Sequence, residues 1–178
     1  MDRGKRVIVG VCGTLSGLAA LYRAVDEARE RGAVLVPVTA WQPSRDDSLR
    51  PLSELEYAAR RRLDTAFDQA FAGYPEGIRI HPLVVRGEPG HVLVAAADRP
   101  DDLLVVGAGG HRRLGQMLHG SVARYCRMHA GCRVVVASPS QLLENLALAA
   151  RSGSPLPFLA GDRGIARPRG LAEADHAG

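Results

Sequence analysis

Short hydrophobic runs recur along the first 138 residues, and segments with a helical spacing of apolar residues separate most of them. The runs are rich in valine, isoleucine and leucine. Continuous apolar runs of this length are typical of strands that are buried on both faces. The expected strands cover residues 6–11, 34–40, 78–85, 103–106 and 133–137.

Polar residues and glycines mark the ends of the expected helices. Thr14 and Ser16 are candidate N-caps for the first helix, and Gly32 is placed to end it with a left-handed residue. Ser53 and Glu56 have the spacing of a capping box at the start of the second helix, which ends near residue 73. A short third helix follows residues 87–90, and a fourth begins near residue 122.

Alternation of buried strands with helices predicts an α/β fold: an open, mostly parallel five-stranded sheet with helices on both faces, in three layers. Pro37 is unusual for a central strand because proline has no backbone N–H. Periodicity does not supply the strand order, and several doubly wound orders remain open. If the first and fourth strands are neighbours, the turn at residues 12–14 faces the loop at 107–121.

The chain divides into a domain and an extension. Residues 1–140 are expected to form one nucleotide-binding domain, which suits the total length of 178 residues. Residues 141–178 are rich in glycine, alanine, proline and arginine, and we expect a largely disordered extension with a short helix over 142–150.

Composition narrows the choice of partners and of cellular location. The net charge is +4, but basic residues are spread along the chain and aromatic residues make up only 4%, so a nucleic-acid partner is disfavoured. No apolar run is long enough to cross a membrane. Cys12, Cys126 and Cys132 form no Cys-x-x-Cys pair, which argues against a disulfide framework and favours a cytoplasmic protein.

A glycine-rich loop after the fourth expected strand carries the strongest indication of function. Gly107, Gly110 and Gly120 precede Ser121 in the pattern Gly-x2-Gly-x9-Gly-Ser, and the next helix begins near Val122. Glycines let the backbone approach an anion closely, and free N–H groups at a helix N-terminus point toward negative charge. The loop therefore predicts a site for the phosphates of a nucleotide.

With this pattern, the chain resembles the universal stress protein family over residues 5–138. Supporting segments are Val-Ile-Val-Gly-Val at 7–11, Gly-Glu-Pro at 87–89 and the run at 129–136. The resemblance implies a strand order of 3-2-1-4-5, a homodimer and an ATP ligand that could carry Mg²⁺. It implies that Gly107, Gly110, Gly120, Ser121 and Val122 hold the triphosphate, with Gly10, Cys12, Ala40 and Val106 near the adenine or the rest of the adenosine.

Position 12 departs from the family pattern. Many members have an aspartate in the run Val-Asp-Gly-Ser, whereas this chain reads Val-Cys-Gly-Thr from residue 11. A thiol accepts hydrogen bonds far more weakly than a carboxylate, so we expect reduced affinity or a changed base preference. Cys12 itself has two interpretations: a redox-sensitive thiol at the mouth of the site, or a small residue tolerated in a turn. The second is favoured.

Signatures of catalysis are absent from the sequence. It contains no Gly-x4-Gly-Lys-Ser/Thr loop, no nucleophile elbow and no acid–base pair near the glycines. We therefore expect an ATP-binding, non-catalytic regulator of the stress response, with slow hydrolysis at most. The alternative is a nucleotide-free dimeric interaction module of the same fold. In either case the last strand is an edge whose run of three valines carries no charge, and the resemblance places the dimer interface at Val134, Val135 and Val136.

Overall fold

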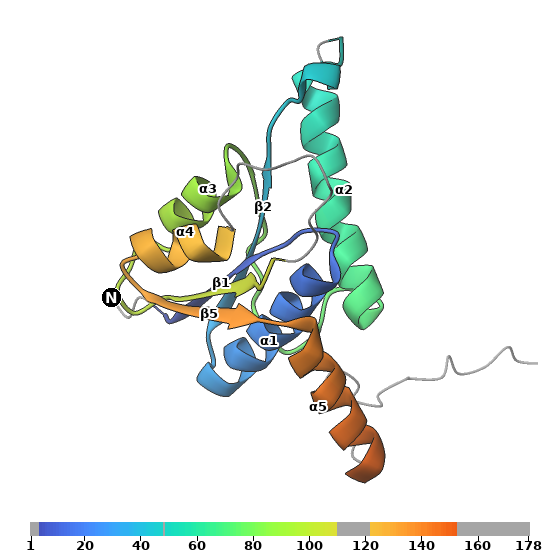
Figure 1. The fold of residues 1–178 in the computed structure, drawn as a ribbon, viewed down its shortest axis with the longest axis vertical. Coiled ribbons are helices and arrows are strands. Elements are labelled where there is room, and N and C mark those ends of the chain that lie inside the picture. The colour runs from blue at the N-terminus through green and yellow to red at the C-terminus, as the bar shows by residue number, and fades with distance from the viewer. Residues whose placement is uncertain (1–3, 48, 110–121, 153–178) are drawn as a thin grey trace, which may run out of the picture.

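A computed structural model describes residues 4–47, 49–109 and 122–152 of the protein (Figure 1). Its centre is a five-stranded sheet in the order β3-β2-β1-β4-β5, with every neighbouring pair parallel. The predicted fold class and the strand order implied by the resemblance are confirmed. The strands are β1 Arg6–Gly10, β2 Val34–Trp41, β3 Leu83–Arg86, β4 Leu103–Gly107 and β5 Arg133–Ala137.

Helices cover both faces of the sheet. One face packs against α1 and α2, and the other packs against α3 and α4 (Figure 1). None of the helices within the described residues is long and apolar enough to cross a membrane. The helices are α1 Leu15–Arg31, the 3₁₀ turn η1 Arg45–Asp47, α2 Leu52–Phe71, α3 Pro89–Ala96, α4 Val122–His129 and α5 Pro139–Ser152.

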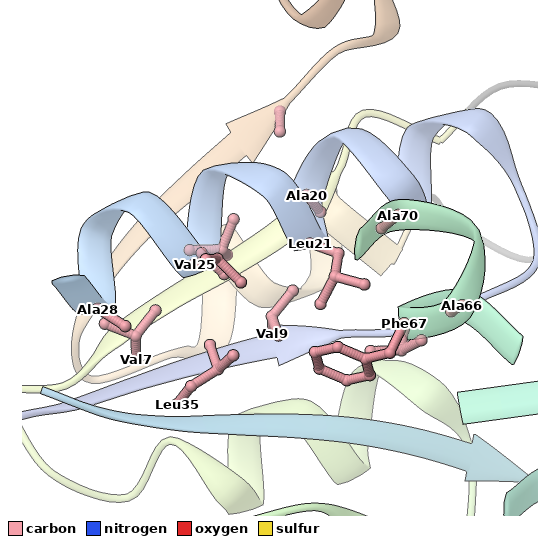
Figure 2. Packing of buried hydrophobic residues seen from close by; sticks show 14 of the residues in the cluster. Val7, Val9, Ala20, Leu21, Val25, Ala28, Leu35, Ala66, Phe67 and Ala70 are labelled. Carbon is pink, nitrogen blue, oxygen red and sulfur yellow. The ribbon is translucent and has the colours of Figure 1, made fainter. Parts of the chain in front are cut away.

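Alternate residues of the central strands enter the two halves of the core. Val7 and Val9 of β1 face α1 and α2, whereas Ile8 between them faces α3 and α4. In Figure 2, Leu21 of α1 and Phe67 of α2 lie over Val9, which is fully buried. This two-sided burial is the physical reason that the strands read as continuous apolar runs.

The ends of α1 follow the sequence prediction. Thr14 is the N-cap, and its hydroxyl oxygen accepts a hydrogen bond of 3.1 Å from the backbone N–H of Gly17. Ser16, the other candidate, lies buried inside the first turn. Gly32 ends the helix with φ 58°, a left-handed conformation that costs glycine little.

The capping-box prediction for α2 is wrong. The helix begins at Leu52, and Pro51 is its N-cap residue, with no side-chain capping bond. Ser53 therefore lies within the first turn, where its side chain is not placed to cap. Proline fixes φ near the value of −58° seen at Pro51, so it can lead into the first turn without using an N–H group. At the other end, Ala72 takes the left-handed conformation with φ 58°.

The third strand is shorter than predicted, and its start explains how Pro37 is accommodated. Leu35 forms an isolated bridge with Ile80, and regular pairing of β2 with β3 resumes only at Val38 opposite Leu83. Pro37 lies between these two points. Backbone groups alternate in direction along a strand, so the Pro37 nitrogen faces β3, as Leu35 does, at the break in pairing. The missing N–H therefore removes no bond from the regular ladder.

Candidate functional site

The carboxyl ends of β1 and β4 lie side by side at the centre of the sheet. The two strands are parallel neighbours, and the last printed pair of their register is Val9 with Val105. From β1 the chain crosses to β2 on one side, and β4 is followed by β5 on the other. Such a point, where the direction of the crossovers reverses, opens a crevice at the carboxyl ends that commonly binds ligands.

The turn between β1 and α1 lies at this end of the sheet, directly after β1. Cys12, Gly13 and Thr14 are exposed, and the Cys12 Sγ atom lies 3.2 Å from the Thr14 hydroxyl oxygen. The turn folds closely onto the helix, because a Cβ atom at Gly17 would lie only 2.7 Å from the Cys12 Sγ. The Cys12 thiol is thus open to solvent and is held beside a capping threonine.

The end of β4 touches the first turn of α1. A Cβ atom at Gly107 would lie 2.6 Å from the backbone carbonyl oxygen of Ser16, so no other residue fits without a shift. Two residues later, Gly109 has φ 65°, where glycine is strongly favoured. The start of the predicted loop therefore has a packing reason and a backbone reason for its glycines.

Four of the predicted site residues lie toward α3 and α4. Ala40, Val106 and Val122 pack against the apolar cluster on that face. Gly10, at the end of β1, approaches the same layer, since a Cβ atom there would lie 3.0 Å from the Leu93 side chain. Gly10 follows the Val9 pair by one residue and is therefore level with Val106. The structure thus brings small or apolar residues together at one end of the sheet.

Gly110, Gly120 and Ser121 lie outside the described residues. The convergence of their backbone N–H groups on a phosphate therefore stays a prediction.

Comparison with known sequences shows which protein family this chain belongs to. The model of the universal stress protein family matches residues 4–138. This chain belongs to that family. Two universal stress proteins of Mycobacterium tuberculosis, Rv2624c and MT2699, are each 31% identical to it over 135 residues. These matches cover 74% of this chain but 47% of each relative, so the chain spans about half the length of the curated relatives it matches.

Solved universal stress proteins share the fold. UspA from Lactobacillus plantarum is 24% identical, with a TM-score of 0.51, and the match covers 77% of this chain and 99% of that one. A universal stress protein in complex with cAMP is 27% identical, with a TM-score of 0.50, and the match covers 76% of this chain and 98% of that one.

The buried hydroxyl of Thr39 is a feature of this universal stress protein that sequence reasoning missed. Thr39 is 4% exposed, and its oxygen has no hydrogen-bond partner within the described part of the chain. It precedes Ala40 near the end of β2, and the alternation of the strand turns it toward the α2 side. A threonine in a strand reads as an ordinary β-branched residue, so the sequence gives no signal of an unpaired hydroxyl.

The other two cysteines of this family member are poorly suited to chemistry. Burial raises the pKa of the Cys126 thiol to about 11, and burial also raises the pKa of Cys132. A raised thiol pKa leaves little of the reactive thiolate at neutral pH. Residues 4–47, 49–109 and 122–152 contain no group of three or more histidine, cysteine, aspartate or glutamate residues that could hold a metal ion.

Proposed function

We propose that this universal stress protein binds an adenine nucleotide, with ATP as the expected ligand, in the crevice at the carboxyl ends of β1 and β4. The observation that carries the proposal is the meeting of the β4 end with the first turn of α1 at Gly107 and Ser16. It places Ala108 and Gly109, the first residues of the loop after β4, close to the start of α1. The solved relative with bound cAMP supports an adenine nucleotide as the ligand class.

The described residues fit the nucleoside half of such a ligand. Gly10 and Ala40 carry little or no side-chain bulk, Val106 is apolar, and the adjoining layer is apolar, as the face of a purine requires. In this proposal the phosphates bind to backbone N–H groups of Gly107, Gly110, Gly120 and Val122 and to the Ser121 hydroxyl. A Mg²⁺ ion carried by the ATP phosphates is compatible with this arrangement.

We infer a regulatory rather than a catalytic role in the stress response. The crevice residues Cys12, Gly13 and Thr14 include no carboxylate or histidine that could act as a general base. A nucleotide held without turnover acts by shifting the population of protein states. The homodimer through Val134, Val135 and Val136 and the cytoplasmic location belong to the same proposal.

Calorimetry on protein stripped of nucleotide tests the ligand. We expect saturable heat with ATP and weaker or no heat with GTP. The variant Gly120→Asp should lose the signal, because it places a carboxylate against the phosphates. The matched control is Gly131→Asp, an exposed glycine with open space around its Cα atom. Heat that is equally absent with ATP, AMP and cAMP would contradict the proposal.

A nucleotide-free interaction module is the second candidate, and one observation favours it. The contact of Gly107 with Ser16 explains that glycine by packing alone, without any ligand. Cys12 in place of the usual aspartate points the same way. This candidate predicts that the wild type and Gly120→Asp have the same oligomeric state and give no nucleotide signal, so the same calorimetry separates the two.

A further inference from the structure

Helix α5 starts two residues after β5 and lies beyond residue 138, where the family match ends. Its inner side joins the domain: Leu142 packs against the core cluster of α1 and α2. Leu142 and Leu146 also line a groove of about 380 Å³ that α5 forms with α1 and the edge strand β5. In Figure 1 the second half of α5 projects beyond the sheet.

The outer side of α5 is apolar as well. Leu143 is 66% exposed, and Ala147 and Ala150 are exposed at the positions four and seven residues later. Residues at this spacing form one stripe along a helix, which we call the α5 stripe. Leu148, beside the stripe, is 62% exposed. A helix that is apolar on both sides normally buries both.

The charges beside the α5 stripe are self-complementary. Glu144 and Arg151 are exposed and seven residues apart, so both lie along the same side of the stripe. When two such helices run antiparallel about a two-fold axis near Ala147, each Glu144 faces an Arg151 of the other copy. A parallel pair would instead place like charges at the same level. Interfaces with two-fold symmetry require this kind of self-complementarity.

We propose that α5 packs antiparallel against α5 of a second copy of this chain, with the α5 stripe in the seam and Glu144 paired with Arg151 twice. The small side chains of Ala147 and Ala150 let the two helices approach closely, and Leu143 fills the seam near each end. This interface is separate from the β5 edge. Two different two-fold interfaces on one chain build assemblies larger than a dimer, so the two contacts are distinguishable by mass.

Charge reversal tests the pairing, with mass measured by analytical ultracentrifugation at low salt over a range of protein concentrations. Glu144→Arg alone and Arg151→Glu alone each create two repulsive contacts, and each should weaken the α5 association by about tenfold or more. The double variant restores both pairs and should assemble as the wild type does. A mixture of the two single variants should also assemble, because each then supplies the charge that the other lacks.

Two comparisons keep the outcome unambiguous. Glu56→Arg reverses an exposed carboxylate on α2 and should leave the mass unchanged. The same charge-reversal variants are also made in a protein that carries Val135→Glu. In that background the β5 contact is already weakened, so any further loss of mass reports on the α5 contact alone. The proposal is overturned if the single variants have the wild-type mass, or if neither the double variant nor the mixture restores it. An α5 stripe covered by residues 153–178 of its own chain, or by another protein, would give the first of these results.

Discussion

Two threonines of this protein show how strongly the effect of one hydroxyl depends on its partner. Thr14 accepts a hydrogen bond at the start of α1, whereas the oxygen of Thr39 is buried with no partner in the described segments. A capping hydroxyl stabilises a helix, and an unpaired buried hydroxyl carries a desolvation penalty. The same substitution at the two positions should therefore change stability in opposite directions.

We expect Thr39→Val to raise the free energy of unfolding by about 1 kcal/mol, because valine keeps the shape and removes the unpaired oxygen. Thr14→Val should lower it by about 1 kcal/mol through loss of the cap. Urea denaturation of the two variants and the wild type checks both values. Equal shifts in one direction would show that the Thr39 hydroxyl is satisfied in solution.

Cys12 provides a residue-level test of ligand recognition. Its side chain is exposed in the turn after β1, at the position where the family pattern given above has an aspartate. If the nucleoside donates hydrogen bonds there, Cys12→Asp should tighten ATP binding by about tenfold, since hydrogen bonds to a charged acceptor are stronger. Cys12→Ala, which adds no acceptor, is the control and should not tighten binding. Calorimetry gives both dissociation constants.

At the scale of single elements, β5 combines an apolar sequence with an open position. Among the described residues it pairs with β4 on one side only, and Val134, Val135 and Val136 are partly buried. Leu83 and Val85 of β3, at the opposite edge, are 39% and 37% exposed. Both edges are thus apolar, and in the proposed homodimer β5 is the edge that forms the interface.

We predict that Val135→Glu weakens the proposed homodimer by placing an uncompensated charge in the interface. Val85→Glu makes the same change on the other edge strand and is the matched control. Sedimentation should give a reduced mass for the first variant and the wild-type mass for the second. A reduced mass for Val85→Glu alone would move the interface to β3.

Some elements could be predicted from the sequence, and others depend on contacts that it does not reveal. The bounds of β5 and the ends of α1 were predicted because apolar runs, Thr14 and Gly32 act locally. The predicted capping box of α2 was wrong because Pro51 is the N-cap residue. The observed β3 starts later in the sequence than predicted because its pairing with β2 is interrupted opposite Pro37. The contact between Gly107 and Ser16 joins segments about ninety residues apart, and composition carries no trace of it.

Across the whole molecule, the two ends of the sheet have different chemistry. At the amino ends, Arg6 of β1 pairs with Asp98 and with Asp102, whose side chain is 1% exposed. The Arg6 Nε donates to the Asp102 carboxylate at 2.9 Å, and this pairing raises the pKa of the Arg6 guanidinium. The carboxyl end of β1 leads instead into Cys12, Gly13 and Thr14, which carry no formal charge. The ion pairs of Arg6 therefore link β1 to the segment before β4 at the end of the sheet opposite the proposed site.

Paired carboxylates make the folded protein sensitive to acid. Burial alone would raise the pKa of Glu27, but hydrogen bonds from Arg31 and Arg23 outweigh it and lower the pKa from its ordinary value of 4.5. The hydrogen bond from Arg6 likewise lowers the pKa of Asp98. A carboxylate whose folded pKa is depressed stabilises the fold above its unfolded pKa, and this contribution is lost as the pH falls through the folded value.

We therefore expect the free energy of unfolding to decline as the pH falls below about 4.5, and Glu27→Gln to make that decline shallower. Glu30→Gln, on the same helix but exposed, is the control and should leave the slope closer to that of the wild type. Urea denaturation at a series of acidic pH values measures the slope. Identical slopes for Glu27→Gln and the wild type would contradict the role given to Glu27.

Helix α1 contacts two separate parts of the molecule. Its first turn contacts Gly107 at the end of β4, and residues further along the helix line the groove beneath α5. The contact with Gly107 is tightly packed, since a Cβ atom added to this glycine would overlap Ser16. A ligand that displaced the β4 end toward the helix would therefore press on Ser16. The residues of α1 that line the groove beneath α5, among them Tyr22 and Asp26, lie about two helical turns further along the same helix.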